Sequence, residues 1–303
     1  MPLPSLQTRL HRAAQAAGSP LQVIEKDYAL SYILAGMASH DQLAHALIFK
    51  GGTALKKLYF GDYRFSEDLD FSTIDAPQGD VLEQILTGAI QVTEQLLQEH
   101  GPFIVTLARY TERDPHPGGQ EAFTVHMQFP WQPRPLCRIK LEITHDEPVM
   151  LPPVKRRLIH GYDEPLMSEI TTYRLDEIVA EKLRTLLQTH AKLQARGWNR
   201  PRARDYYDLW RIIGTFRGEL DFPRIRQCLD AKCVVRDVAY TRLDDFFTPL
   251  LVGEAQRAWE SNLGTFVRNL PSCEQVLHEL RILMMEVIPI DEITDLGARE
   301  AAP

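Results

Sequence analysis

Two aspartates, Asp68 and Asp70, carry the strongest chemical signal in the sequence. They lie in a short run, Asp-Leu-Asp-Phe-Ser, whose alternation of polar and apolar residues predicts a half-buried strand. Side chains two apart on a strand leave the same face, so the two carboxylates are predicted to repel each other unless a cation lies between them. A divalent cation with oxygen ligands is the usual solution. The alternative is an exposed polar strand face, which is the commoner explanation of an isolated Asp-x-Asp pair.

A glycine turn upstream favours the metal-site interpretation. Gly51 and Gly52 follow a short apolar run and allow backbone N–H groups to approach an anion, and Thr53 adds a hydroxyl where the next helix is predicted to begin. A phosphate-binding turn beside a carboxylate pair is the minimum equipment for phosphoryl transfer. Glu142, on a later predicted strand, is the best candidate for a third carboxylate, with a surface glutamate at a strand end as the alternative.

A lysine on the apolar side of a helix gives a second signal. At helical spacing, one stripe contains Leu175, Ile178, Val179, Leu183, Leu186 and Leu193. Lys182 falls within this stripe, whereas Glu181 and Arg184 fall outside it. The Lys182 ammonium is predicted either to reach a bound triphosphate or a carboxylate cluster, or only to extend past the core to water. Asp205 and Asp208 lie three apart on the next predicted helix.

Charge is unevenly distributed along the chain. The 34 Lys and Arg residues against 41 Asp and Glu residues give a net charge of −7, which argues weakly against a nucleic-acid partner. Residues 155–226, however, carry 15 basic and 10 acidic residues, and seven basic residues follow one another without an acidic one. These seven are Lys182, Arg184, Lys192, Arg196, Arg200, Arg202 and Arg204. Such a segment is typical both of a solvated helix face and of an anion-binding surface.

The composition is that of an ordinary globular protein. The 303 residues are 44% hydrophobic and 25% charged, which excludes disordered, collagen-like and disulfide-scaffold classes. The four cysteines show no Cys-x-x-Cys spacing and no export signal precedes them, so we expect reduced thiols and a cytoplasmic location. No apolar run is long enough to predict a membrane span.

A sheet followed by helices must position these candidates. Apolar periodicity predicts helices over residues 5–16, 20–37 and 80–99, and strands over 47–49, 68–72, 103–110, 123–129 and 137–144. Ser19 is predicted to be the N-cap of the second helix and Pro20 its first residue. From Leu175 onward the pattern is almost wholly helical. The sequence therefore predicts an α+β chain, with a small mixed sheet and flanking helices over residues 1–155 and a helical lobe over residues 156–303.

Four strings in this order resemble the AbiEii/AbiGii nucleotidyltransferase toxins, which include MenT-like proteins. The strings are Ile24-Glu-Lys-Asp, the Gly-Gly-Thr block, Arg64-Phe-Ser-Glu-Asp-Leu-Asp-Phe, and the Glu181-Lys182 helix followed by Arg204-Asp-Tyr-Tyr-Asp-Leu-Trp. Each string alone is weak evidence, but their common order over roughly residues 20–215 makes the resemblance specific. It implies a DNA polymerase β-like nucleotidyltransferase core and a helical lobe that completes the active-site cleft.

The resemblance also implies roles for residues of the turn. Gly52 and Thr53 match the family's Gly-Ser turn, with threonine in place of serine, and Gly51 would assist them in binding the phosphates of an NTP. The loop from Thr53 to Asp68 is longer than the short-spaced version in the family, which leaves the phosphate contacts open. Ser66 is a candidate either for a phosphate contact or for a modification that would block the site.

The mechanism that the resemblance implies is metal-dependent nucleotidyl transfer. Asp68 and Asp70 match the family's metal-binding acids and, with Glu142, would hold Mg²⁺, or Mn²⁺ in its place. Lys182 matches the lysine of the second lobe and would stabilise charge on the leaving pyrophosphate. Asp205 matches the aspartate that follows it and would position Lys182 or the incoming base.

In characterised relatives the acceptor is tRNA, so we expect transfer of NMP to RNA, most of all to the tRNA 3′ end, and a block of translation. The expected context is a toxin–antitoxin or phage-defence system with an antitoxin encoded nearby. The RNA backbone would be bound by Arg196, Arg200, Arg202 and Arg204. The alternatives are NMP transfer to a protein side chain, a catalytically inert RNA- or protein-binding relative, and metal-dependent phosphodiester hydrolysis.

Overall fold

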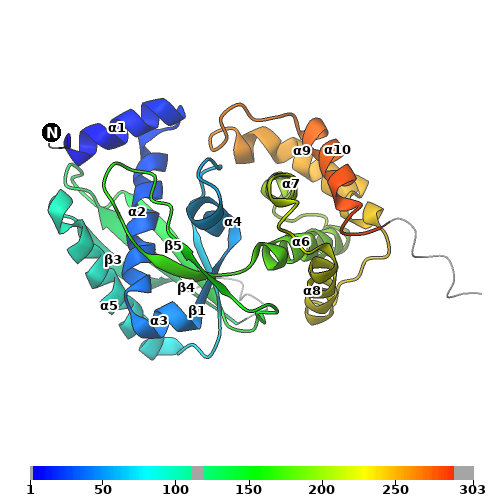
Figure 1. Cartoon of the computed structure of the whole chain (residues 1–303), viewed down its shortest axis with the longest axis horizontal. Helices are drawn as coiled ribbons and strands as arrows, with labels where there is room; N and C mark the ends of the chain where they lie inside the picture. Colours follow the sequence, from blue (N-terminus) through cyan, green and yellow to red (C-terminus); the bar gives the residue numbers. More distant parts are fainter. Residues whose placement is uncertain (1–2, 111–118, 290–303) are drawn as a thin grey trace, which may run out of the picture. The chain divides into compact units, whose positions relative to one another are not determined.

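The computed structural model describes residues 3–110 and 119–289, which form two compact units (Figure 1). The first unit extends to Arg174 and includes Thr265–Arg268, and the second begins at Leu175. Thr265–Arg268 belongs to the first unit because its backbone and side chains bond there. Phe65 N donates to Phe266 O at 3.2 Å, and Arg268 Nη1 donates to Ala16 O at 3.1 Å.

A mixed sheet forms the centre of the first unit. In the described residues it has seven strands in the order β3-β4-β5-β2-β1-β7-β6. The strands are β1 (Leu47–Lys50), β2 (Leu69–Thr73), β3 (Ile104–Tyr110), β4 (Gln120–Gln128), β5 (Cys137–Thr144), β6 (Val154–Arg157) and β7 (Glu169–Thr172). The pairs β2·β5 and β1·β7 are parallel and the other neighbours are antiparallel. The predicted α+β class with a small mixed sheet is confirmed.

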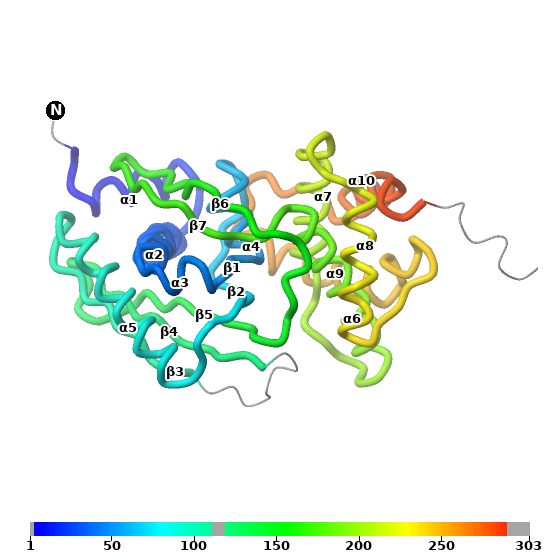
Figure 2. The backbone as a smooth tube through the Cα atoms, turned by 60° about the horizontal axis from the view of Figure 1, so that its bottom comes forward, coloured from blue at the N-terminus to red at the C-terminus, as the bar shows by residue number. Residues whose placement is uncertain are grey.

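Helices pack against this sheet and close its core. They are α1 (Leu6–Ala17), α2 (Leu21–Ala38), α3 (Asp41–Ala46) and α5 (Gly79–Leu97). α2 packs on α5, β5 and β7, and Figure 2 shows α2 and α5 on the inner side of the curved sheet. α2 is buried on almost every side, so its sequence is apolar nearly all round rather than on one stripe. In β5 the alternate residues Ile139, Leu141 and Ile143 are fully buried in this core.

Three details of the predicted elements are wrong. α2 begins at Leu21 with Pro20 as its N-cap, because Pro20 has an extended backbone (φ −57°, ψ 144°). The strands β6 and β7 were not predicted, since four residues are too few to show a period. β7 joins the sheet beside β1, where Phe49 pairs with Thr172. The sheet therefore extends almost to Arg174, and the two units divide there rather than at the predicted boundary between residues 155 and 156.

The second unit is helical, as predicted from Leu175 onward. Its helices are α6 (Leu175–Arg196), α7 (Ala203–Phe216), α8 (Phe222–Val235), α9 (Pro249–Leu263) and α10 (Cys273–Met284). α6 packs on α8, and α7 packs on α9 and α10. Within residues 3–110 and 119–289, no helix is both long and apolar enough to cross a membrane. All four cysteines are free thiols.

Candidate active site

The glycine turn lies where β1 ends. A short helix, α4 (Gly51–Ala54), begins directly at Gly51 rather than at Thr53 and continues as one π-type turn, η1 (Leu55–Tyr59). Gly51 has φ +79°, and a Cβ built on it would lie 2.5 Å from Asp70 Oδ2. A side chain here would be strained by the backbone conformation and would have to displace the Asp70 carboxylate, which favours glycine. The turn and the acidic strand are therefore in direct contact.

A cation and a hydroxyl lie against the second glycine. A Cβ on Gly52 would clash with Arg64 Nη2 and would lie 3.3 Å from Ser66 Oγ. Arg64 is only 4% exposed, so its charge lies at the turn rather than in bulk water. The Arg64-Phe-Ser-Glu-Asp-Leu-Asp-Phe string was noted in the sequence, but Arg64 itself was given no role. Its charge beside two glycines suits an anion.

Thr53 connects the turn to the acidic strand. Its Oγ1 donates a hydrogen bond of 2.5 Å to the carbonyl oxygen of Asp68, and the residue is 1% exposed. In this structure the hydroxyl therefore fixes the backbone before β2. The direct phosphate contact expected of Thr53 remains a prediction.

The acidic pair lies at the start of β2. Asp68 directly precedes the strand, and Asp70 pairs in register with Lys50 of β1 and with Glu142 of β5. Asp70 and Glu142 are thus on neighbouring strands and share a face of the sheet. Glu142 Oε1 already accepts hydrogen bonds from Lys140 Nζ (2.7 Å) and from a glutamine amide of β4 (2.5 Å).

The donor chemistry of this pair fits Mg²⁺, since carboxylate oxygens are its preferred protein ligands. Among the residues that the structure describes, however, no three His, Cys, Asp or Glu side chains are grouped as a ready metal site. Glu142 would have to exchange its lysine and glutamine partners for a cation. The assignment of Asp68 and Asp70 as metal ligands, with Glu142 as the third, remains a prediction.

Lys182 lies in the second unit between two carboxylates. It is 8% exposed, which confirms its predicted place on the apolar side of α6. Its Nζ lies 2.8 Å from Asp205 Oδ1 and 2.7 Å from Asp208 Oδ2. Burial raises the pKa of Asp205, but Lys182 and then Arg202 outweigh it and hold that pKa below its ordinary value. Asp208 is fully buried; the sequence placed it near Asp205 but gave it no role.

The comparison with protein-family models decides the assignment. Residues 32–282 match the family described as "Nucleotidyl transferase AbiEii toxin, Type IV TA system". The chain belongs to the AbiEii family. The match includes residues of both units, among them Asp68, Asp70, Lys182 and Asp205. A search of curated proteins found no match.

AbiEii membership makes the chain a nucleotidyltransferase toxin of a Type IV toxin–antitoxin system and implies a cognate antitoxin. The Ile24-Glu-Lys-Asp string precedes the matched residues, and the structure gives it a supporting role. Asp27 Oδ2 lies 2.7 Å from Lys57 Nζ, and Lys57 follows the glycine turn closely in the sequence. Lys26 Nζ lies 2.9 Å from Glu67 Oε1, the residue before Asp68. Both pairs connect α2 to segments that carry the candidate site.

The cationic segment of this AbiEii toxin divides into exposed and structural arginines. Arg196 and Arg200 are exposed. Arg202 donates to Thr189 Oγ1 (2.9 Å), and its Nη1 lies 3.6 Å from Asp205 Oδ2. Arg204 Nε donates to the carbonyl oxygen of Asn262 (3.1 Å), and this hydrogen bond connects α7 to α9. Arg196 and Arg200 are therefore the better placed of the four predicted RNA contacts.

The electrostatic surroundings of Lys192 include further cations near this segment. Burial lowers the pKa of Lys192, and the nearby charges of Arg202, Arg196, Arg184 and then Arg236 lower it further. The sequence did not associate Arg236 with this group, because it lies on a different part of the chain. Arg184 was predicted to lie outside the apolar stripe of α6, but the residue is nevertheless buried, with 6% of it exposed.

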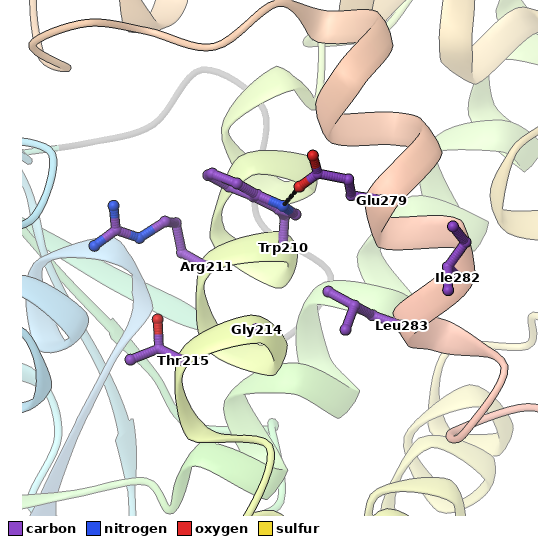
Figure 3. A pocket seen from close by; sticks show the side chains of 7 residues that line it. All are labelled: Trp210, Arg211, Gly214, Thr215, Glu279, Ile282 and Leu283. Atoms are coloured by element: carbon purple, nitrogen blue, oxygen red, sulfur yellow. Dashed lines mark hydrogen bonds between the residues drawn. The ribbon is translucent and has the colours of Figure 1, made fainter.

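A pocket of about 560 Å³ lies between α7 and α10 in the second unit (Figure 3). It is lined by Trp210, Arg211, Gly214, Thr215, Glu279, Ile282 and Leu283. Trp210 Nε1 of α7 donates to Glu279 Oε2 of α10 at 2.7 Å. None of the predicted site residues lines this pocket, so we assign it no part in nucleotidyl transfer.

Proposed function

We propose that this AbiEii toxin transfers a nucleoside monophosphate from an NTP to RNA, with the 3′ end of tRNA as the acceptor, and so blocks translation in the cytoplasm. The proximity of Gly51 and Asp70 supports the proposal, because it joins the predicted phosphate-binding turn to a predicted metal-binding acid. A hydrolase of phosphodiesters uses similar acids but has no need of a triphosphate-binding turn. The same chemistry suits a phage-defence toxin.

The proposed reaction forms a bond between a ribose hydroxyl oxygen of the acceptor and the α-phosphorus of the NTP. The bond from this phosphorus to pyrophosphate breaks, and the hydroxyl proton leaves to solvent. Mg²⁺, when bound, neutralises the triphosphate and lowers the pKa of the attacking hydroxyl. Asp68 and Asp70 would hold it, with Glu142 as third ligand, and Mn²⁺ would serve in its place.

The remaining roles follow from charge and position. The backbone N–H groups of Gly51 and Gly52 bind the β- and γ-phosphates, and Arg64 adds a positive charge at the same turn. Lys182 stabilises charge on the leaving pyrophosphate, and Asp205 positions its ammonium at 2.8 Å.

The test is incubation of the toxin with each α-labelled NTP, Mg²⁺ and total tRNA, followed by denaturing electrophoresis. We expect label in tRNA and an increase of its mass by one or more nucleotides. Asp70→Asn should abolish the signal, because asparagine lacks the charge that holds a divalent cation. Asp75→Asn is the matched control: Asp75 is an exposed carboxylate just beyond β2, and asparagine tolerates its φ of 51°.

Other results identify the alternatives. Label in protein but not in RNA indicates transfer to a side chain. Shortened tRNA indicates hydrolysis, and binding without turnover indicates an inert relative. Full activity of Asp70→Asn would contradict the site assignment. Ser66→Asp should also abolish transfer, since it places a negative charge next to Gly52; an active variant would exclude Ser66 from the phosphate site and as a point of control.

A further inference from the structure

Trp198 is the most conspicuous side chain of the cationic segment. It lies in the loop between α6, which ends at Arg196, and α7, which begins at Ala203, and it is 71% exposed. A single exposed apolar side chain is normal and by itself indicates nothing. What distinguishes this indole is its setting, since Arg196 and Arg200 lie two residues away on either side and are both exposed.

The loop has a defined shape. Gly197 has φ +74° and ends α6 by donating its N–H to Leu193 O at 2.9 Å. Asn199 Oδ1 then accepts a hydrogen bond of 2.9 Å from Arg200 N, and Pro201 fixes the backbone before α7. An aromatic side chain on such a loop is presented with less conformational freedom than on a flexible tail, which favours its use as a binding surface.

This loop is connected to the proposed catalytic lysine by charge. Arg202 Nη1 lies 3.6 Å from Asp205 Oδ2, and the other oxygen of Asp205 lies 2.8 Å from Lys182 Nζ. Arg202 Nε is in turn held by Thr189 of α6 at 2.9 Å. Within the second unit, one carboxylate therefore connects the basic loop with the ammonium that is proposed to stabilise pyrophosphate.

An aromatic ring flanked by guanidinium groups has the chemistry of a site for single-stranded nucleic acid. Bases stack on the ring irrespective of their identity, and cations neutralise the neighbouring phosphates. A base inside a duplex is already stacked on both faces and cannot use the ring. Arg196 and Arg200, both exposed and two residues from the ring on either side, supply the matching charge.

We propose that Trp198 is the stacking platform for an unpaired nucleotide of the RNA acceptor. The inference rests on the proposed function and specifies its substrate as RNA with a single-stranded end. Trp198 is thus a specificity-determining residue, which distinguishes frayed or overhanging ends from blunt duplex. It takes no part in the chemistry of transfer.

The experiment measures RNA binding by the full-length protein without NTP. The probes are a labelled two-stranded RNA duplex with an unpaired 3′ extension of about four nucleotides and the same duplex with blunt ends. Trp198→Ala should weaken binding of the extended probe at least about fivefold and leave the blunt probe unchanged. Trp198→Phe, which keeps an aromatic face, should restore binding to within about twofold.

Two control variants separate stacking from other effects. Arg196→Gln should weaken both probes alike, because it removes a phosphate contact that does not depend on strandedness. Met167→Ala should change neither, although Met167 is 80% exposed and apolar like Trp198, because its charged neighbours in the sequence, Glu164 and Glu169, are acidic. Trp198 is exposed, so its replacement does not endanger the fold, and circular dichroism confirms this for each variant.

Each outcome decides the proposal. Equal affinity of Trp198→Ala and wild type for the extended probe would overturn it, as would an equal loss for both probes or a wild type that binds no RNA. If the wild type transfers label from NTP to tRNA but Trp198→Ala binds the extended probe as well as the wild type does, the proposed function is supported and the stacking role of Trp198 is refuted. Conversely, preference for the extended probe that depends on Trp198, with no label transferred, would refute nucleotidyl transfer to RNA and retain the stacking site.

Discussion

The buried ion pair between Asp27 and Lys57 is predicted to stabilise the first unit. The substitution Asp27→Asn tests this contribution to the free energy of unfolding. Asp27 Oδ2 lies 2.7 Å from Lys57 Nζ, and the two side chains are 6% and 1% exposed. Ser31 Oγ accepts a second hydrogen bond from the ammonium at 2.9 Å, and Tyr162 OH donates to Asp27 at 3.0 Å. Burial lowers the pKa of Lys57 to about 8, against the attraction of Asp27, which raises it.

Asp27→Asn removes the charge that keeps the proton on Lys57. At pH 7 the wild type gains about 1–2 kcal/mol from a lysine pKa that lies above the ambient pH, and the variant loses this gain by releasing the proton. The weakened hydrogen bond between the two side chains adds about 1 kcal/mol. The free energy of unfolding should therefore fall by about 2–3 kcal/mol. This is less than the ~3–5 kcal/mol of a stranded buried charge, because a lysine can discharge itself.

The pH dependence makes the reasoning refutable. A lysine whose pKa is lowered in the folded state binds fewer protons there than in the unfolded state, so stability rises with pH between about 8 and the ordinary lysine value in the wild type. In Asp27→Asn this rise begins at lower pH. By pH 9, Lys57 is mostly neutral in both folded proteins, and the deficit of the variant should have shrunk by about 1–2 kcal/mol.

Urea unfolding followed by circular dichroism at pH 7, 8 and 9 measures this deficit. In a Lys57→Met background, Asp27→Asn should no longer lower the free energy of unfolding, because it then removes a buried carboxylate that has lost its partner. The deficit that shrinks between pH 7 and pH 9 should be absent, because the titrating lysine is gone. A deficit in the original background that is the same at pH 7 and pH 9 would refute the assignment of the proton to Lys57.

Two further predictions concern the turn and a second buried charge. Gly51→Ala should lower the rate of nucleotide transfer at least about a hundredfold, because its Cβ displaces the Asp70 carboxylate. The control is Gly61→Ala, whose Cβ meets nothing within 4 Å and which should leave that rate unchanged. Equal rates for the two variants would exclude a role for the contact between Gly51 and Asp70. Glu164→Gln leaves the buried guanidinium of Arg9 without its carboxylate and should cost about 3–5 kcal/mol at pH 7 in urea unfolding. Burial raises the pKa of Glu164, but hydrogen bonds hold it below the ordinary value. The free energy of unfolding of the variant should therefore approach that of the wild type as pH falls below about 4.5, because the carboxylate becomes protonated there in the unfolded wild type. A difference in this free energy that stays constant with pH would contradict the prediction.

The sequence by itself determined the candidate chemistry and most of the elements that carry it. Period-two alternation identified the strand that carries Asp70 and directly follows Asp68, and helical spacing placed Lys182 on a buried face. These features depend on neighbours within a few residues, so local patterns are sufficient to predict them. The glycine turn was identified for the same reason, although only the structure shows that the Asp70 carboxylate occupies the space of a Gly51 side chain.

Tertiary structure alone decided which charges meet. Asp208 lies against Lys182, and Asp27 lies against Lys57, although neither pair was predicted and each is distant in the sequence. A buried charge is stable only with a partner, and the partner is fixed by packing and strand register rather than by spacing along the chain. For the same reason no local pattern could predict that a short hairpin would extend the sheet to Arg174, and so move the boundary between the units.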